Sequence, residues 1–302
     1  DCGLHCWFKS PNKPGWLLNL EAPCYIAVVS YAEDRDLRET LYEAYVTRAS
    51  DLGPHGGQFD NTQIIYDILA LRAEKSKLLT FDSYASLSLA TKMAEDPQAV
   101  FEFIHSLTEQ VLPEAKKDVA ALKVFAKTHW QIDTLKPWDT HYVSQKRKQA
   151  LFNINDEALR PYFPLPKVLE GAFHIIQTLY DITLRDVTES VDTWHTDVSC
   201  YGLFDNHNTC IGYIYMDLFA RPHKRQGSWM DDAQSRHLKS DDTIQPPIAM
   251  LTCNFAKSER YDFPTLSHDE VTTFFHELGH CLHHTLTRVD ELSAAGINGV
   301  EW

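Results

Sequence analysis

The chain contains 302 residues, of which 44% are hydrophobic and 23% are charged. This mixture is ordinary for a globular protein and excludes wholesale disorder. The formal net charge of -14 argues against nucleic acid and anionic membranes as partners, because both would repel the chain. No run of eighteen apolar residues occurs, so no membrane-spanning helix is predicted. We therefore expect an acidic, soluble, cytoplasmic protein.

Both ends of the chain are atypical of complete proteins. The first residues, 1–7, lack the basic and apolar regions of a signal peptide, and the chain does not begin with Met. The last residue, Trp302, is a large aromatic that follows soon after a helical stretch. We expect the chain to be an internal piece of a longer protein.

The seven cysteines are odd in number and include no CxxC pair. In a long acidic chain without a signal peptide, they are predicted to be reduced thiols of a cytosolic protein. Cys2 and Cys6 could together bind a metal, but no second pair is placed to complete such a site.

A short strand is predicted at 15–20, and residues 34–186 are mostly helical in their periodicity. Asp96-Pro97 is a favourable helix start, and the proline-rich residues 161–166 break the helical pattern. Apolar residues recur at i, i+3 and i+4, which predicts helix faces packed into a core. These residues are Leu37, Leu41, Ala44 and Tyr45; Ile64, Ile65, Ile68 and Leu69; Phe101, Ile104, Leu107 and Val111; Leu122, Phe125 and Ala126; and Phe173, Ile176, Leu179 and Tyr180.

The pattern changes near Trp194. Residues 199–204 and 210–219 are rich in β-branched and aromatic side chains and predict a hairpin with a turn at 206–208. Residues 248–255 predict another strand, and a polar loop is expected at 221–245. The fold class is therefore mainly α (α+β), with a small sheet next to the final helix. We expect a mainly helical region at 1–190 and a region with the sheet and the final helix at 191–302.

The final helix carries the pattern His276-Glu277-x-x-His280 (HExxH), which is typical of zinc peptidases. Residues four apart lie on one face of a helix, so both imidazoles can reach one Zn²⁺. Glu277 lies beside the metal, where it can take a proton from the attacking water. The alternative interpretation is a histidine-rich turn on a surface helix, because the pattern also occurs by chance.

The surroundings of the pattern favour the zinc interpretation. Ser267 and Glu270 form a capping box before an apolar helix, so the pattern begins two turns inside a well-capped helix. Gly279 lowers helix propensity, and its small size could let another segment approach closely. His284 lies one turn beyond His280, and we interpret it as a structural or supporting residue rather than a ligand.

A catalytic zinc site needs a third protein ligand, and the sequence does not place one. No HxxGxxH follows His280, which disfavours a metzincin. Asp290 and Glu291 follow the pattern too closely for an obvious ligand on a second helix, and Glu301 lies at the end of the chain.

The same residues and many others resemble the thimet oligopeptidase and oligopeptidase A family of zinc peptidases, especially its bacterial members. The resemblance runs in order along almost the whole chain from Gly15. The stretches that carry it are Gly15-Trp16-x-Leu18, Tyr45–Ser50, Lys92–Ala94, Lys136–Asp139, Leu159–Phe163, Trp194–Val198, Tyr213–Arg221, Lys224–Gly227, Leu251–Phe255 and His268–His280.

The resemblance implies a mainly helical, two-lobed zincin-type fold with a deep channel and one zinc ion per molecule. It implies that His276 and His280 are zinc ligands, that Glu277 is the general base, and that short peptides are the substrates. An edge strand of the small sheet would pair with the peptide backbone. The family's third ligand, a Glu on a later helix, would fall just past Trp302.

The sequence leaves two candidate functions from different classes, an enzyme and a non-catalytic protein. In the first, the parent protein is a monomeric zinc-dependent endopeptidase that hydrolyses short oligopeptides. In the second, the chain is a catalytically incomplete fragment that acts only as a helical scaffold or a weak metal or peptide binder. Asp217, Arg221, Lys224 and Arg225 either border the channel or form ion pairs in a solvated loop.

Overall fold

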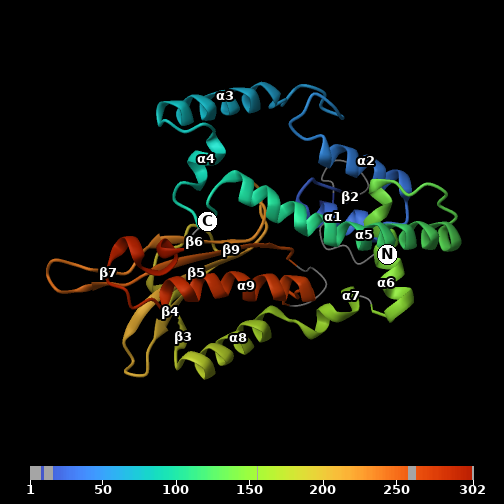
Figure 1. Cartoon of the computed structure of the whole chain (residues 1–302). Helices are drawn as coiled ribbons and strands as arrows, with labels where there is room; N and C mark the ends of the chain where they lie inside the picture. The colour runs from blue at the N-terminus through green and yellow to red at the C-terminus, as the bar shows by residue number, and fades with distance from the viewer. Residues whose placement is uncertain (1–7, 10–15, 155, 258–262, 301–302) are drawn as a thin grey trace.

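The computed structural model of the chain describes residues 8–9, 16–154, 156–257 and 263–300 (Figure 1). Helices make up most of the first half, and a mixed sheet with two covering helices makes up the second (Figure 1). The predicted fold class is confirmed: the chain has a mainly helical zincin-type fold with a small sheet next to the helix of the HExxH pattern.

The two helix starts predicted from the sequence, at Pro97 and just after Ser267, are confirmed among the helices of the described residues. These helices are α1 (Ala22–Tyr31), α2 (Arg35–Val46), α3 (Thr62–Leu78), α4 (Tyr84–Leu89), α5 (Pro97–Trp130), α6 (Pro137–Phe152), α7 (Asp156–Leu159), α8 (Leu165–Tyr180) and α9 (His268–Thr285). The Asp96 side chain accepts a hydrogen bond from the Ala99 amide at the start of α5, with Pro97 in the first turn. Short 3₁₀ turns lie at Arg160–Tyr162, Thr188–Ser190, Leu292–Ala294 and Gly296–Gly299.

The main sheet has five strands in the order β3-β4-β5-β9-β6. They are β3 (Thr183–Asp186), β4 (Val198–Phe204), β5 (Cys210–Phe219), β6 (Trp229–Gln234) and β9 (Ile248–Phe255). The central pair, β5 and β9, is parallel, and the other pairs are antiparallel. Two small antiparallel pairs are β1 (Phe8–Lys9) with β2 (Trp16–Leu17), and β7 (His237–Leu238) with β8 (Ile244–Gln245).

The sequence prediction of strands was right at the sheet centre and wrong at its edges. β5 and β9 have the predicted bounds, and the turn after β4 places Asn208 at φ 62°. Residues 183–186, expected to be helical, form the edge strand β3. The expected polar loop contains β6, because an edge strand needs only one apolar face and tolerates charged residues.

The sheet, α8 and α9 share one hydrophobic core. Its fully buried members include Ala172 of α8, Leu203, Ile214 and Leu251 of the sheet, and Phe274 of α9. In Figure 1, α8 and α9 run side by side along the sheet. This packing fixes α9, and with it the HExxH pattern, against the strands.

The first helices form a separate cluster around a buried ion pair. Arg38 of α2 is only 1% exposed, and its guanidinium donates to Asp139 of α6 at 3.1 Å and to the Ala32 carbonyl at 2.7 Å. Arg35 donates to the same carboxylate at 2.7 Å and 2.9 Å. Although burial opposes it, the two arginines and the Lys136 amide lower the pKa of Asp139.

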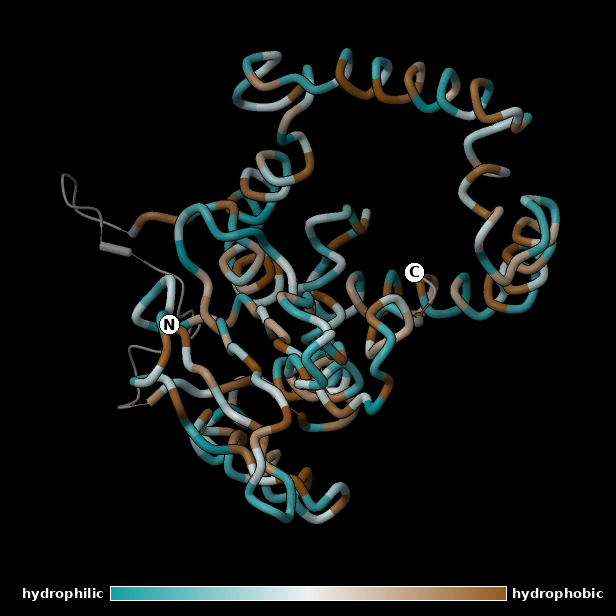
Figure 2. Tube along the Cα trace, turned by 90° about the vertical axis from the view of Figure 1, so that its left-hand side faces the viewer, coloured by the Kyte–Doolittle hydropathy of each residue, from teal (hydrophilic) through white to brown (hydrophobic). Residues whose placement is uncertain are grey.

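The predicted core packing of the middle helices was wrong for two of the five apolar stripes. On α3, Ile64, Ile65 and Leu69 are each more than half exposed, and Phe101 of α5 is 67% exposed. Figure 1 shows α3 lying apart from the sheet, and Figure 2 shows apolar residues spread along it. Periodicity and caps specify a helix, but they do not specify its partner, and none lies against this face within the described residues.

The other three stripes meet the prediction to different degrees. Leu122 and Ala126 of α5 are buried against α6, and Leu41 of α2 is buried against α1. On α8, Ile176 is buried but Leu179 is 67% exposed, because the helix passes the edge of the sheet. The division of the chain at residue 190 stays a prediction.

Candidate functional site

Helix α9 is held at its start by the predicted capping box. The Ser267 hydroxyl accepts from the Glu270 amide at 3.1 Å, and the Glu270 carboxylate accepts from the Ser267 amide at 2.7 Å. Glu270 also accepts from Arg160 at 2.8 Å, which ties the helix start to the segment before α8. These contacts fix the first turn, so the next two turns present His276 and Glu277 in a defined direction.

The two histidines of the pattern lie together on an open face of α9. Their Nε2 atoms are 3.2 Å apart, and their rings are almost perpendicular. Two nitrogens that each lie about 2.0–2.1 Å from a tetrahedral zinc ion are about 3.3 Å apart. His276 and His280 therefore already have the separation that two ligands of one zinc ion require.

Glu277 points to a different side of the same helix. It is only 8% exposed, and it forms no hydrogen bond or ion pair within the described part of the chain. Burial raises the pKa of the neighbouring Cys253 thiol to about 12, an effect that the Ser228 side chain partly offsets and the Glu277 charge reinforces. The carboxylate therefore lies on the side of α9 that faces the sheet, within electrostatic range of Cys253 of β9.

A third ligand is not placed beside the histidines. Among residues 8–9, 16–154, 156–257 and 263–300, no group of three His, Cys, Asp or Glu side chains could hold a metal ion. Asp290 accepts from Arg236 at 2.8 Å, and Glu291 is exposed. Glu301, Cys2 and Cys6 lie outside the described residues.

His284 connects α9 to the end of β6. It is fully buried, its Nε2 donates to the Gln234 carbonyl at 2.9 Å, and its Nδ1 accepts from the Ile297 amide at 3.4 Å. Both ring nitrogens therefore bind backbone groups, which leaves neither for a metal and agrees with the structural role expected for this residue. Gly296 has φ +59°, and a Cβ there would lie 2.8–2.9 Å from atoms of His284.

The expected role of Gly279 was wrong. A Cβ at this position would have no atom within 4 Å, so no described segment approaches it closely. The residue lies on the exposed side of α9, next to the face that carries the histidine pair.

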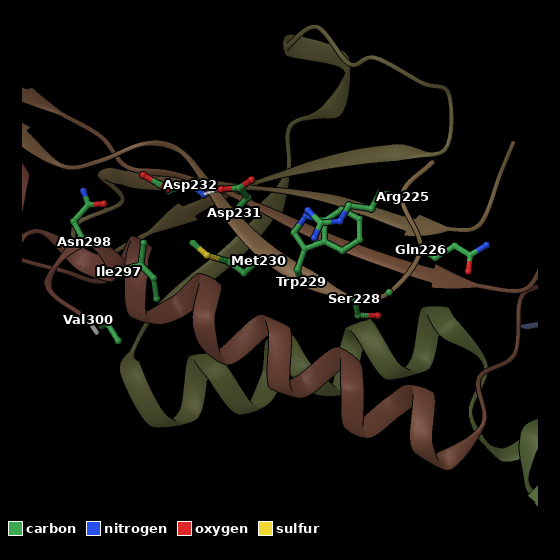
Figure 3. Close-up of a pocket in the computed structure, with 11 residues that line it drawn as sticks. Arg225, Gln226, Ser228, Trp229, Met230, Asp231, Asp232, Ile297, Asn298 and Val300 are labelled. Atoms are coloured by element: carbon green, nitrogen blue, oxygen red, sulfur yellow. Dashed lines mark hydrogen bonds between the residues drawn. The ribbon is translucent and has the colours of Figure 1, made fainter. Parts of the chain in front are cut away.

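Strand β6, which the sequence did not reveal, runs beside α9 at the edge of the sheet. Its neighbour on one side is β9, and its other edge has no strand partner within the described residues. A cavity of about 560 Å³ follows this edge. Figure 3 shows its lining side chains along β6 from Ser228 to Asp232, with Ile297, Asn298 and Val300 at the far end. The only signal in the sequence for this strand was the apolar pair Trp229-Met230, which lies shortly after Gly227 and among charged residues.

The charged residues of 217–225 behave differently from a solvated loop. Asp217, 6% exposed in its side chain, accepts from Arg221 at 2.6 and 2.7 Å, Lys224 at 2.8 Å and Trp194 at 3.0 Å. Burial opposes ionisation, but these donors lower the pKa of Asp217 to about 2. Arg225 instead lies over the Trp229 ring and lines the β6 cavity. The first three are therefore structural, and only Arg225 borders the site.

Comparison with known proteins agrees with the geometry of α9. The chain is 46% identical to oligopeptidase A of Salmonella typhimurium and to oligopeptidase A of Escherichia coli, each over 294 residues and 97% of this chain. It is 39% identical to a probable cytosolic oligopeptidase A of Arabidopsis thaliana over 95% of this chain. The chain spans only 43%, 43% and 41% of these relatives.

A sequence model of peptidase family M3 matches residues 28–302, which includes every element from the end of α1 to the loop after α9. The resemblance inferred from the sequence is thereby confirmed, and the chain belongs to peptidase family M3.

Proposed function

We propose that this chain forms part of a zinc-dependent oligopeptidase in which His276 and His280 bind zinc and Glu277 is the general base. One observation carries the proposal: the two imidazole nitrogens lie 3.2 Å apart on a helix packed beside an open sheet edge. Family membership and the names of the similar proteins support peptide bond hydrolysis. The fit of the histidines supports zinc as the metal.

The chemistry of the chain's own residues follows from their positions. Zinc, when bound, would polarise the scissile carbonyl and make water a better nucleophile at neutral pH. Glu277 would take the proton from the attacking water and deliver it to the leaving amine. Its burial and its lack of a described hydrogen-bond partner leave the carboxylate available for this transfer.

Strand β6 supports short peptides as substrates. A peptide backbone that pairs with its open edge would gain hydrogen bonds without being read by sequence, and the 560 Å³ cavity would receive its side chains. We further propose a cytoplasmic monomer that binds neither nucleic acid nor membranes, as the charge of -14 indicates. Within the described residues, no helix combines the length and apolar content needed to cross a bilayer.

The site needs a third zinc ligand, and we propose that it comes from the protein sequence downstream of this chain. The absence of a third candidate among the described residues favours a second possibility for the chain by itself. In that case residues 1–302 alone are a catalytically incomplete scaffold that binds metal or peptide weakly. The proposed boundary at residue 190 separates this scaffold's helical region from the region that carries the site.

Turnover of a quenched fluorescent peptide by the full-length protein tests the activity. Glu277→Gln should retain stoichiometric zinc and lose turnover by at least about 100-fold, because the proton acceptor is gone. The matched control is Glu291→Gln, an exposed residue that should keep full activity. Retained turnover in Glu277→Gln would exclude the assigned base, and turnover by residues 1–302 alone would exclude the scaffold alternative.

A further inference from the structure

A second cavity, of about 350 Å³, lies at the start of α9. Its walls come from α1, from the first two turns of α9 and from the end of β9. Gly227 and Ser228 line both this cavity and the one along β6, so both spaces border the start of β6. None of the metal-binding or catalytic residues proposed above lines it.

The cavity lies on the metal side of α9. Thr273, which lines it, precedes His276 by three residues and so lies beside it on the helix surface. The start of α9 lies near the start of β6, because Glu270 and Thr273 line the same cavity as Ser228. The end of α9 lies near the end of β6, because His284 donates to the Gln234 carbonyl. α9 and β6 therefore run in the same direction. The cavity lies beside the start of both elements.

The chemistry of the walls favours an uncharged side chain. α1 contributes Ala22, Pro23, Ile26 and Ala27. The wall carboxylates of Asp156 and Glu270 are each paired with a cation, at 2.8 Å from Lys148 and Arg160 respectively, and the third wall carboxylate, Asp269, has a side chain that is 99% exposed. A charged side chain would therefore lose hydration and gain at most a solvent-exposed ion pair with Asp269, whereas an apolar one would bury its surface against α1.

A peptide paired antiparallel to β6 would run from the Gln234 end to the Ser228 end. Its carboxyl half would therefore reach Gly227 and Ser228, where the second cavity begins. We propose that this cavity is a specificity pocket that binds the apolar side chain of a substrate residue on the carboxyl side of the cleaved bond. This inference rests on the proposed function, because it needs a peptide on the β6 edge.

Peptide binding to the full-length protein carrying Glu277→Gln tests the pocket without requiring cleavage. Two labelled octapeptides of equal composition carry one Phe among small polar residues, either near the carboxyl end or near the amino end. Fluorescence anisotropy gives the Kd of each. We expect the peptide with the carboxyl-side Phe to bind about tenfold more tightly than the peptide with the amino-side Phe.

Two cavity variants and one control assign that preference to the pocket. Ala27→Phe should fill the cavity and abolish the tenfold preference, and Ile26→Ala should reduce it by removing apolar wall. Ile175→Ala is the control, because Ile175 is similarly exposed, at 45% against 52% for Ile26, but lies on α8. Ile26→Ala removes only a half-exposed side chain, so it remains informative if Ala27→Phe does not fold.

The outcomes separate this inference from the proposed function. An unchanged preference in both cavity variants would overturn the pocket, and so would a loss confined to the peptide with the amino-side Phe. Failure of the peptide with the carboxyl-side Phe to bind would also overturn it. Absence of peptide hydrolysis by the protein with Glu277 intact would contradict the proposed function but leave the binding comparison valid.

Discussion

The histidines of α9 fall into two groups. Some are open to solvent, and others are buried and form hydrogen bonds with backbone groups. His276 is exposed and close to His280, as a metal ligand must be, whereas His284 on the same helix is buried and saturated by Gln234 and Ile297. The same residue type thus has two environments on one helix, one open to solvent and one enclosed by backbone partners.

Removal of His284 should destabilise the fold. His284→Ala leaves the Gln234 carbonyl and the Ile297 amide without their partner, which should lower the free energy of unfolding by about 2–3 kcal/mol. Urea denaturation measures this change. His283→Ala is the control, since His283 is exposed and should cost less than about 0.5 kcal/mol. Equal stability of the two variants would refute the structural role.

The low pKa of Asp217 predicts a pH dependence of stability. Its folded pKa of about 2 lies below the unfolded value near 3.9, so its ionised form favours the fold. The contribution, roughly 2 kcal/mol, should be complete above about pH 5 and disappear as the pH falls toward 2. Denaturation of wild type and Asp217→Asn between pH 6 and 2.5 should show a converging difference. A constant difference would exclude the ionised cluster.

Whole elements show how the site gains its rigidity. α9 is fixed at its first turn by the capping box and along its length by the shared core with the sheet. β6 has the opposite character, with one paired edge, one open edge and exposed aspartates at Asp231 and Asp232. Charged residues on an open edge discourage pairing with other chains while leaving the backbone accessible to a short peptide.

Loss of the cap should weaken α9 by a modest amount. Ser267→Ala removes the acceptor for the Glu270 amide, and we expect the free energy of unfolding to fall by about 1 kcal/mol. Thr272→Ala, an exposed change within the same helix, is the control. Chemical denaturation with a circular dichroism signal gives both values, and a smaller loss for Ser267→Ala than for the control would contradict the capping role.

At the scale of the whole molecule, two well-packed cores contrast with the segment that contains α3 and α4, which is more exposed. The sheet with α8 and α9 forms one core, and α1, α2 and α6 form another around Arg38 and Asp139. α3 packs against neither core, and many of its apolar side chains are more than half exposed.

This contrast predicts unequal local stability. Backbone amides of α3 should exchange with deuterium at least about tenfold faster than those of α9, because little burial opposes their opening. Hydrogen exchange followed by mass spectrometry on residues 1–302 measures both segments. Equal protection of α3 and α9 would show that the apolar face of α3 is covered.

Local signals in the sequence predicted the helix starts, the central strands and the HExxH pair, because each depends on nearby residues. Asp96-Pro97 and the Ser267 cap are examples, as are the bounds of β5 and β9. The sequence did not reveal β6, whose pairing with β9 is non-local and whose residues are half polar. Nor could it show that the apolar face of α3 is largely uncovered among the described residues, since periodicity indicates a face and not its contact.

The most direct test of a metal centre on α9 is zinc binding by isothermal titration calorimetry, with the metal content of the full-length protein as a second readout. We predict one zinc ion per molecule, an affinity at least about 100-fold weaker in His276→Ala, and no change in His283→Ala. One tightly bound zinc ion in both variants would contradict the assignment of His276 and His280 as ligands.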